Sequence, residues 1–282
     1  MNNFRTNLLA CVLAIFVSGC GFRFIYNHLD WWANWYLDDY VTLTELQQQA
    51  FDRSFEALHD WHRTTQLPLY VKQLKALQFS INNDLSEQQV AENLTQLLEH
   101  WQNILIAVEP KLQPLAFSLS AKQKQQLLLA LKAAQQEQND DNEMLTQQQW
   151  FEVRTAQQTD QLKAWFGRLS TKQKQQVNLL SQSYQRSFEP RMNYRQHWTN
   201  QFAELLNAEL PEHQFKFEFY RLFVNGRSLR DDNLNAITKN NNQVFARIFV
   251  YMTTSATDKQ RKRINKKINK LVGDLNYLIA NN

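Results

Sequence analysis

The side chains best suited to acid–base chemistry lie early in the chain. Asp30, Asp38 and Asp39 fall in an aromatic segment, and His59 follows further along. Paired carboxylates, or a carboxylate beside an imidazole, can act as general acid and base. Aspartates in such segments more often cap helices or pair with arginine. Catalysis through an acidic cluster near residues 30–60 is therefore the alternative hypothesis, and we assign no catalytic residue.

The histidines also raise the question of a metal site. Glu56, His59 and His62 share one face of an expected helix, and Glu-x-x-His is one part of the di-iron sites of helical bundles. Those sites need a second copy, which this sequence lacks. It also has no Gly-x-Ser-x-Gly, phosphate-binding glycine loop or dinucleotide fingerprint. We expect the protein to hold no metal and no cofactor, and we expect that it is not an enzyme.

Cys20 stands at the end of a short apolar run. The run spans residues 8–21, whereas a helix that crosses a bilayer needs roughly 20 residues. Val17-Ser18-Gly19-Cys20 resembles the bacterial lipobox, in which the cysteine is acylated with fatty acids such as palmitate and becomes the mature N-terminus. We therefore predict that residues 1–19 are a cleaved lipoprotein signal peptide and that Cys20 is the lipidation site.

The predicted anchor indicates a location. Several acyl chains hold a protein stably on a membrane, so the membrane itself is the first partner that we expect. Gly21 follows Cys20, whereas an aspartate at this position commonly marks inner-membrane retention in lipoproteins. The sequence therefore favours the periplasmic face of the bacterial outer membrane. Removal of the signal peptide also removes Cys11, which leaves no cysteine pair for a disulfide.

The composition predicts an all-α protein. Five glycines and five prolines among 282 residues are too few for a turn-rich β fold, and glutamine, leucine, alanine and lysine favour helices. Ser or Thr followed three residues later by Gln, the capping box that opens a helix, predicts a helix start in five places. These boxes are Thr44–Gln47, Ser86–Gln89, Ser120–Gln123, Ser170–Gln173 and Thr257–Gln260. We expect a multi-helix bundle of about eight to nine amphipathic helices.

The domain organisation leaves two possibilities. Residues 20–282 form a single all-helical periplasmic domain, or two subdomains with a boundary near 110–119, where Pro110 and Pro114 bracket an expected connector. Elsewhere, the alternation in Phe215–Phe219 is strand-like, but its helical flanks favour a helix.

Two segments are candidates for surface contacts. The aromatic residues Trp31, Trp32, Trp35 and Tyr36 lie close to Cys20, and such residues belong either in a protein core or at a membrane interface.

The charge is unevenly distributed along the chain. Residues 21–109 carry 12 acidic and 5 basic side chains, whereas residues 110–282 carry 15 acidic and 25 basic ones. Contact with anionic lipid, lipopolysaccharide or glycan is one interpretation of the basic surface, and simple solvation is the other. The export signal argues against nucleic acid. The candidate anionic contacts are Arg261, Arg263, Lys266, Lys267 and Lys270.

Together these features resemble a family. The lipobox, the segment Tyr26–Val41, the first Leu-Thr-x-x-Gln box, Trp61-His-Arg and Leu67-Pro-Leu-Tyr70 are similar to proteobacterial outer-membrane-linked lipoproteins that share a domain of unknown function. The sequence departs from them at Glu45-Leu46, where Pro-Glu is common. The resemblance implies a helical lipoprotein and brings no activity. The Leu-Thr-x-x-Gln boxes are more loosely similar to those of Spy-type periplasmic chaperones.

Three functions follow from these observations. The favoured one is a binding or scaffold lipoprotein of the cell envelope, with a chaperone-like role included, whose partner is an envelope protein or an anionic lipid such as lipopolysaccharide. The second is an envelope enzyme that acts on glycan or lipid through the acidic cluster. The third is a purely structural lipoprotein.

Overall fold

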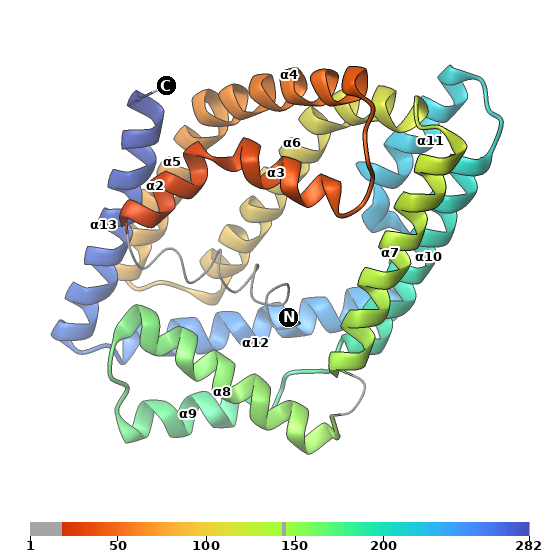
Figure 1. Ribbon diagram of the computed structural model, residues 1–282. Coiled ribbons are helices and arrows are strands. Elements are labelled where there is room, and N and C mark those ends of the chain that lie inside the picture. The colour runs from red at the N-terminus through yellow and green to blue at the C-terminus, as the bar shows by residue number, and fades with distance from the viewer. Residues whose placement is uncertain (1–18, 143–144, 282) are drawn as a thin grey trace.

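The computed structural model describes residues 19–142 and 145–281, and every regular element in these ranges is helical (Figure 1). The predicted signal peptide lies outside the described residues except for Gly19. Cys20 falls in the first described helix, but its side chain is outside the description. The α-helices are α2 (Gly19–Asn27), α3 (Leu29–Asp38), α4 (Glu45–Trp61), α5 (Leu67–Asn82), α6 (Glu87–Phe117), α7 (Ala121–Asn142), α8 (Gln147–Phe166), α9 (Thr171–Ser181), α10 (Phe188–Asn207), α11 (Glu212–Phe223), α12 (Asp232–Thr254) and α13 (Asp258–Ala280).

Two short helical turns complete the described chain. The π-helix η1 (His62–Gln66) joins α4 to α5, and the 3₁₀-helix η2 (Gly226–Leu229) precedes α12. The prediction of an all-α fold is therefore confirmed, and the Phe215–Phe219 segment is helical within α11.

The predicted number of helices, eight to nine, is too low, since the described residues contain the twelve α-helices α2–α13. One reason is that α2 and α3 are separated only at His28, without a glycine, a proline or a side-chain cap. Another is that Thr146–Gln149 is a sixth capping box, which opens α8 from within a run of glutamines. The break at His28 carries no strong local signal, whereas the box at Thr146 is a signal that the predictions did not include.

All five predicted capping boxes begin helices, and the glutamines of four of them also join helices that are distant in sequence. The Gln123 amide donates to Gln47 Oε1 at 2.6 Å, and the Gln47 amide donates back to Gln123 Oε1 at 3.4 Å. Gln173 and Gln260 exchange the same two hydrogen bonds, each at 3.0 Å. The starts of α4 and α7, and those of α9 and α13, are thereby held together in pairs.

The predicted connector at Pro110 and Pro114 is wrong, because α6 continues through both prolines. A proline inside a helix removes one backbone hydrogen bond and crowds the carbonyl four residues earlier. The two prolines are one turn apart and both are exposed, so the carbonyl groups that lose their helical donors lie on the solvent side. The opposite face of the same turns stays packed through Gln113 and Ala116. The subdomain boundary near 110–119 stays a prediction.

Helix α6 connects two hydrophobic clusters. Its N-terminal part contributes Val90 to a large cluster with helices α2, α5, α8, α9, α12 and α13. Its C-terminal part contributes Ala116 to a smaller cluster with α7, α10 and α11. At 31 residues, α6 extends about 46 Å, enough to reach both. Figure 1 shows α13 on one side of the molecule, α7 beside α10 on the other, and α12 running between them.

Candidate functional site

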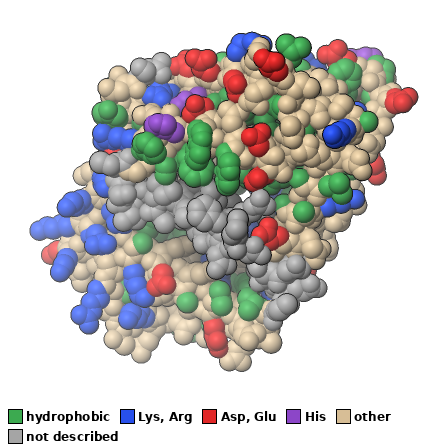
Figure 2. All heavy atoms as spheres, in the orientation of Figure 1, with side chains coloured by type: hydrophobic (Ala, Val, Ile, Leu, Met, Phe, Trp, Pro, Cys, Tyr) green, Lys and Arg blue, Asp and Glu red, His purple; other side chains and the backbone are tan. Residues whose placement is uncertain are grey.

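The predicted aromatic residues lie on the surface, on helix α3. Trp31, Trp35 and Tyr36 are 59%, 43% and 50% exposed, and no residue of α3 is buried. Trp32 is half-buried and meets Trp31 and Trp35 edge-on, at ring-centroid distances of 4.9 and 5.9 Å. Figure 2 shows hydrophobic side chains gathered over the region of α2 and α3. These four side chains are therefore not part of the core, whereas Tyr26 of the same aromatic segment is buried in it. Contact with a membrane stays a prediction.

An apolar hollow of about 610 Å³, which we call the aromatic groove, lies between α3 and the helices α4, α6 and α7. Lys111 is the only Lys, Arg, Asp or Glu among its described lining residues. The lining residues are Leu29, Ala33, Tyr36, Leu37, Tyr40, Phe51, Ser54, Phe55, Leu58, His59, Trp61, His62, Ile104, Val108, Lys111, Leu112, Leu127 and Leu131. A volume of this size and an apolar lining are typical of ligand-binding pockets.

A polar hollow of about 720 Å³ lies next to the aromatic groove, and Phe55 and His59 line both. We call it the polar pocket. Asp30 and His59, two of the four candidates for catalysis, converge here together with Asp52 and Glu56. Asp38 and Asp39, at the end of α3, do not line it. His62 borders only the groove, so Glu56, His59 and His62 do not share one pocket.

Arg63 forms part of the wall of the polar pocket and joins the two ends of the described chain. Its guanidinium donates to the carbonyl oxygens of Leu278 and Asn281, at 3.3 and 2.6 Å, and to Asn27 Oδ1 at 3.0 Å. The residue is buried and lies in η1, whose wider turns separate α4 from α5. It therefore ties α2 to the end of α13 beneath the pocket.

A hydrogen-bonded chain of aromatic residues lies behind the aromatic groove. His62 Nδ1 is 2.9 Å from the Tyr26 hydroxyl, and His62 Nε2 is 3.1 Å from the Tyr70 hydroxyl. Burial lowers the pKa of His62 to about 4, with a smaller effect from His59, and burial raises the pKa of Tyr70 to about 12. Burial also raises the pKa of Tyr26. These three side chains are thus uncharged at neutral pH and suit a packed interior.

His59 occupies the wall between the two hollows. Its Nε2 is buried and has no hydrogen-bond partner in the described chain. Burial lowers the pKa of the imidazole, and the nearby Arg63 lowers it further. A neutral imidazole with an unused nitrogen can donate to or accept from a polar group of a ligand. No three His, Cys, Asp or Glu side chains of the described residues lie close enough together to hold a metal ion.

The predicted basic residues of α13 divide into two kinds. Arg261 donates to the carbonyl oxygens of Ile81 and Thr253, at 3.0 and 3.2 Å, and is thus bound to the helix ends. Lys267 lies 5.6 Å from the Trp165 ring centroid, and burial together with neighbouring basic groups lowers its pKa. Arg263, Lys266 and Lys270 are exposed. Lys and Arg side chains gather on this side of the molecule in Figure 2.

One group of charged residues was not among the sequence predictions, namely four arginines in the first half of α10 and in or just after η2. Arg191 and Arg195 come from α10, and Arg227 and Arg230 from η2 and its C-cap. The first pair is separated from the second by more than thirty residues and all of α11. Their one local signal is spacing at a single helical turn within each pair.

None of the described helices is both long enough and apolar enough to span a membrane.

A family of unknown function (DUF6279) matches residues 39–229, which is more than half of the chain. The chain belongs to this family. The matched range includes α4–α11, η1 and η2 and leaves out α2, α3, α12 and α13. The predicted membership is therefore confirmed, and the proteobacterial lipoprotein context stays a prediction. No curated protein and no solved structure matches the chain.

Proposed function

We propose that this protein is a lipid-anchored binding protein of the bacterial outer membrane, on its periplasmic face. Its aromatic groove would hold an apolar helical segment of an envelope protein. The observation that carries this proposal is the groove itself, an apolar hollow of about 610 Å³ with one lysine in its lining. Exposed apolar surfaces of this kind in a folded protein mark interaction sites.

The shape and composition of the groove favour a protein helix as the ligand. Its walls are helices, and an amphipathic helix binds such grooves through residues on one face. Tyr36, Tyr40 and Phe55 supply the large rigid side chains that dominate protein interfaces. Lys111 can pair with an acidic residue on the polar face of the bound helix.

The position of the groove supports capture close to a membrane. Cys20 belongs to α2, which ends at Asn27, two residues before α3 begins. A helix as short as α2, at nine residues, extends only about 13 Å. If Cys20 is acylated as predicted, α3 and the groove beneath it lie close to the bilayer surface.

The enzyme alternative depends on the polar pocket, where Asp30 and His59 converge as that alternative requires. We favour binding because Asp38 and Asp39 stay outside the pocket and no Ser, Thr, Cys or Lys is among its described lining residues. The variant D30N/H59Q separates the two functions. Loss of the protein's effect on the envelope, with capture in the aromatic groove retained, would favour the enzyme.

Photocrosslinking in cells tests the binding proposal. A photoreactive phenylalanine analogue at Leu131 points the label at the groove, whereas the same label at Leu129, 60% exposed on the same helix, is the matched control. We expect one envelope protein crosslinked at 131 and not at 129, through a peptide with an apolar helical face. Filling the groove with Ala33→Trp should abolish that product. A lipid product alone, or no product, would overturn the proposal.

A further inference from the structure

Four arginines surround a cleft on α6 that is separate from the aromatic groove. The cleft measures about 620 Å³, and Arg191, Arg195, Arg227 and Arg230 all line it. No Asp or Glu contributes to its lining in the described chain. We call it the arginine cleft. An adjoining hollow of about 490 Å³ shares Arg227 and Arg230 and adds one charge of each sign, Glu87 and Lys239.

These guanidinium groups have no acidic partners. Within residues 19–142 and 145–281, none of the four side chains forms a hydrogen bond or an ion pair, and Arg230 Nε is buried without a partner. Partial burial lowers the pKa of Arg191, and Arg195, Arg230 and Arg154 lower it further. Burial also lowers the pKa of Arg227, and Arg230 lowers it further. Like charges brought together in this way are unfavourable until an anion binds between them.

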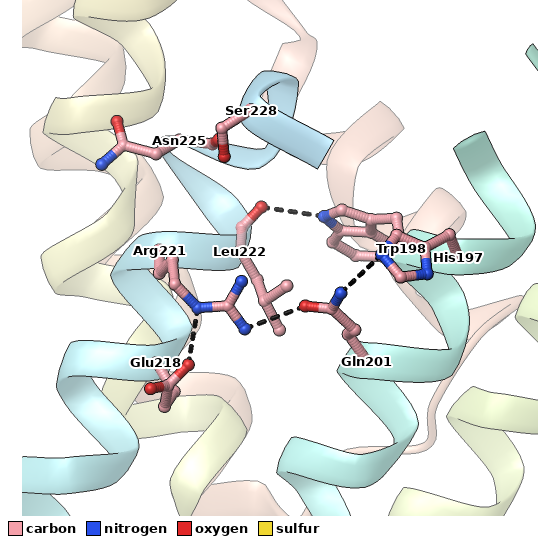
Figure 3. Close-up of polar contacts among 8 residues, drawn as sticks. All are labelled: His197, Trp198, Gln201, Glu218, Arg221, Leu222, Asn225 and Ser228. Carbon is pink, nitrogen blue, oxygen red and sulfur yellow. Dashed lines mark hydrogen bonds and ion pairs between the residues drawn. The ribbon is translucent and has the colours of Figure 1, made fainter. Parts of the chain in front are cut away.

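The neighbouring Arg221 shows how an arginine in the same region is normally neutralised. Its Nε donates to Glu218 at 2.7 Å, and its guanidinium also donates to Gln201 Oε1 at 2.9 Å (Figure 3). The four arginines of the cleft have no such arrangement. Their free donors are therefore a specific property of the cleft.

The opposite wall of the cleft is apolar. It is formed by α6, whose residues Leu97, Leu98 and Trp101 are 56%, 40% and 54% exposed, with Leu94 and Leu105 on the same face. A small inorganic anion would leave this surface in contact with water. A ligand that combines an anionic group with a hydrocarbon chain would cover it, at about 25 cal/mol for each Å² buried.

The end of the cleft near α10 and α11 is rigidly packed. The Trp198 indole donates to the Leu222 carbonyl at 2.8 Å (Figure 3). The same indole stacks on the Phe202 ring. Gly226 lies beneath the indole, since a Cβ at this position would come within 3.1 Å of Trp198 Nε1. This close contact fixes the start of η2 and thereby places Arg227 and Arg230 opposite α10.

We infer that the arginine cleft binds an anionic lipid, with its phosphate between the arginines and an acyl chain along α6. Arginine suits this role because its planar donors match phosphate oxygens in pairs. The lipid class follows from the apolar wall and the charge of the cleft together. This site is distinct from the aromatic groove and does not depend on the function proposed above.

Calorimetry with the full acylated protein in a nonionic detergent tests the inference. The probes are dioctanoyl phosphatidylglycerol, the zwitterionic dioctanoyl phosphatidylcholine, inorganic phosphate and a Glu-rich peptide. We expect phosphatidylglycerol to bind, and R191Q/R230Q to weaken it by about tenfold to a hundredfold through the lost charge-assisted hydrogen bonds. R221Q, which alters an arginine that is already paired, should bind as the wild type does.

Further variants separate the anion from the chain and guard against unfolding. Leu97→Ser should weaken phosphatidylglycerol binding and leave phosphate binding unchanged. If circular dichroism shows that R191Q/R230Q is unfolded, the exposed Arg195→Gln replaces it. Equal binding of phosphate and phosphatidylglycerol would overturn the lipid as ligand, as would preference for the peptide or for phosphatidylcholine. No binding of any probe would overturn the site.

Discussion

Gln173 and Gln260 lie 87 residues apart and exchange two amide hydrogen bonds of 3.0 Å each in the interior. Each glutamine also completes the capping box of its own helix, through the backbone amides of Ser170 and Thr257. Their remaining donors reach the carbonyl oxygens of Ser255 and Arg168. These two Ser/Thr-x-x-Gln boxes therefore serve as a long-range connection in this fold as well as helix starts.

Removal of one of these glutamines should cost more than the loss of an ordinary capping box. We expect Gln173→Ala to lower the free energy of unfolding by about 2 kcal/mol, because Gln260 and the Ser255 carbonyl would lose buried partners. The exposed Gln149, whose box joins no second helix, is the control, and Gln149→Ala should cost about 0.5 kcal/mol. Urea denaturation measures both. Equal losses would show that the connection between the boxes contributes nothing.

These boxes also show what sequence can and cannot predict here. A capping box is a signal of four residues, so the start of a helix that opens with one could be predicted from the chain alone. Helices α3, α5, α10 and α11 have no side-chain cap at their starts, so this signal does not locate them. The pairing of Gln47 with Gln123 depends on tertiary packing, for which single-sequence patterns carry no information. Pro110 and Pro114 were misleading because their tolerance depends on which face of α6 meets solvent.

The candidate sites were less predictable than the helices. Asp30 and His59 could be selected as residue types, but only the fold places them in one pocket and leaves Asp38 outside it. The arginine cleft could not be predicted from the chain, because α11 separates its two pairs of arginines along the sequence and they come together only in the fold. Sites assembled from distant segments depend on packing that the local sequence does not determine.

Stability should depend on pH through His62. Burial lowers its pKa to about 4 in the folded protein, against 6.5 for an ordinary histidine. As pH falls, the unfolded chain takes up the proton first, so stability is complete above pH 6.5 and decreases as the pH falls towards 4. The full loss is about 3 kcal/mol.

Urea denaturation at pH 7 and pH 5 tests this dependence. His62→Gln retains one donor and one acceptor for Tyr26 and Tyr70 but cannot titrate, so it should lose less stability than the wild type between the two pH values. Part of the dependence should remain, because the pKa values of His59 and His100 are also lowered by burial. Parallel losses in wild type and variant would contradict the role of His62.

Two glycines should respond to alanine with opposite signs. Gly167 ends α8 with φ +83°, and an added Cβ would lie 3.1 Å from Arg263 Cδ. Gly167→Ala should therefore destabilise the protein by about 2 kcal/mol. Gly273 lies within α13, where a Cβ would meet nothing within 4 Å, so Gly273→Ala should stabilise it by about 0.5–1 kcal/mol. Thermal unfolding of both variants checks the signs, and a stabilising Gly167→Ala would refute the assigned strain.

The predicted lipid anchor gives the most direct test in cells. Cys20 and Cys11 are the only two cysteines, and the lipobox assigns acylation to Cys20 alone. Cells grown with an alkyne analogue of palmitate should label the wild-type protein and Cys11→Ser, whereas Cys20→Ser should lose the label. Several acyl chains give effectively permanent attachment, so Cys20→Ser should also leave the outer-membrane fraction.

The two cysteine variants distinguish acylation from an ordinary export signal. With an ordinary signal peptide, neither the wild type nor the two variants would take up the label, and the mature protein would be found in the soluble periplasmic fraction. That result would remove the anchor and with it the argument that the aromatic groove lies near a bilayer. The arginine cleft would be unaffected, because its lining belongs to α6 and to the chain from α10 to α12, and none of it depends on Cys20.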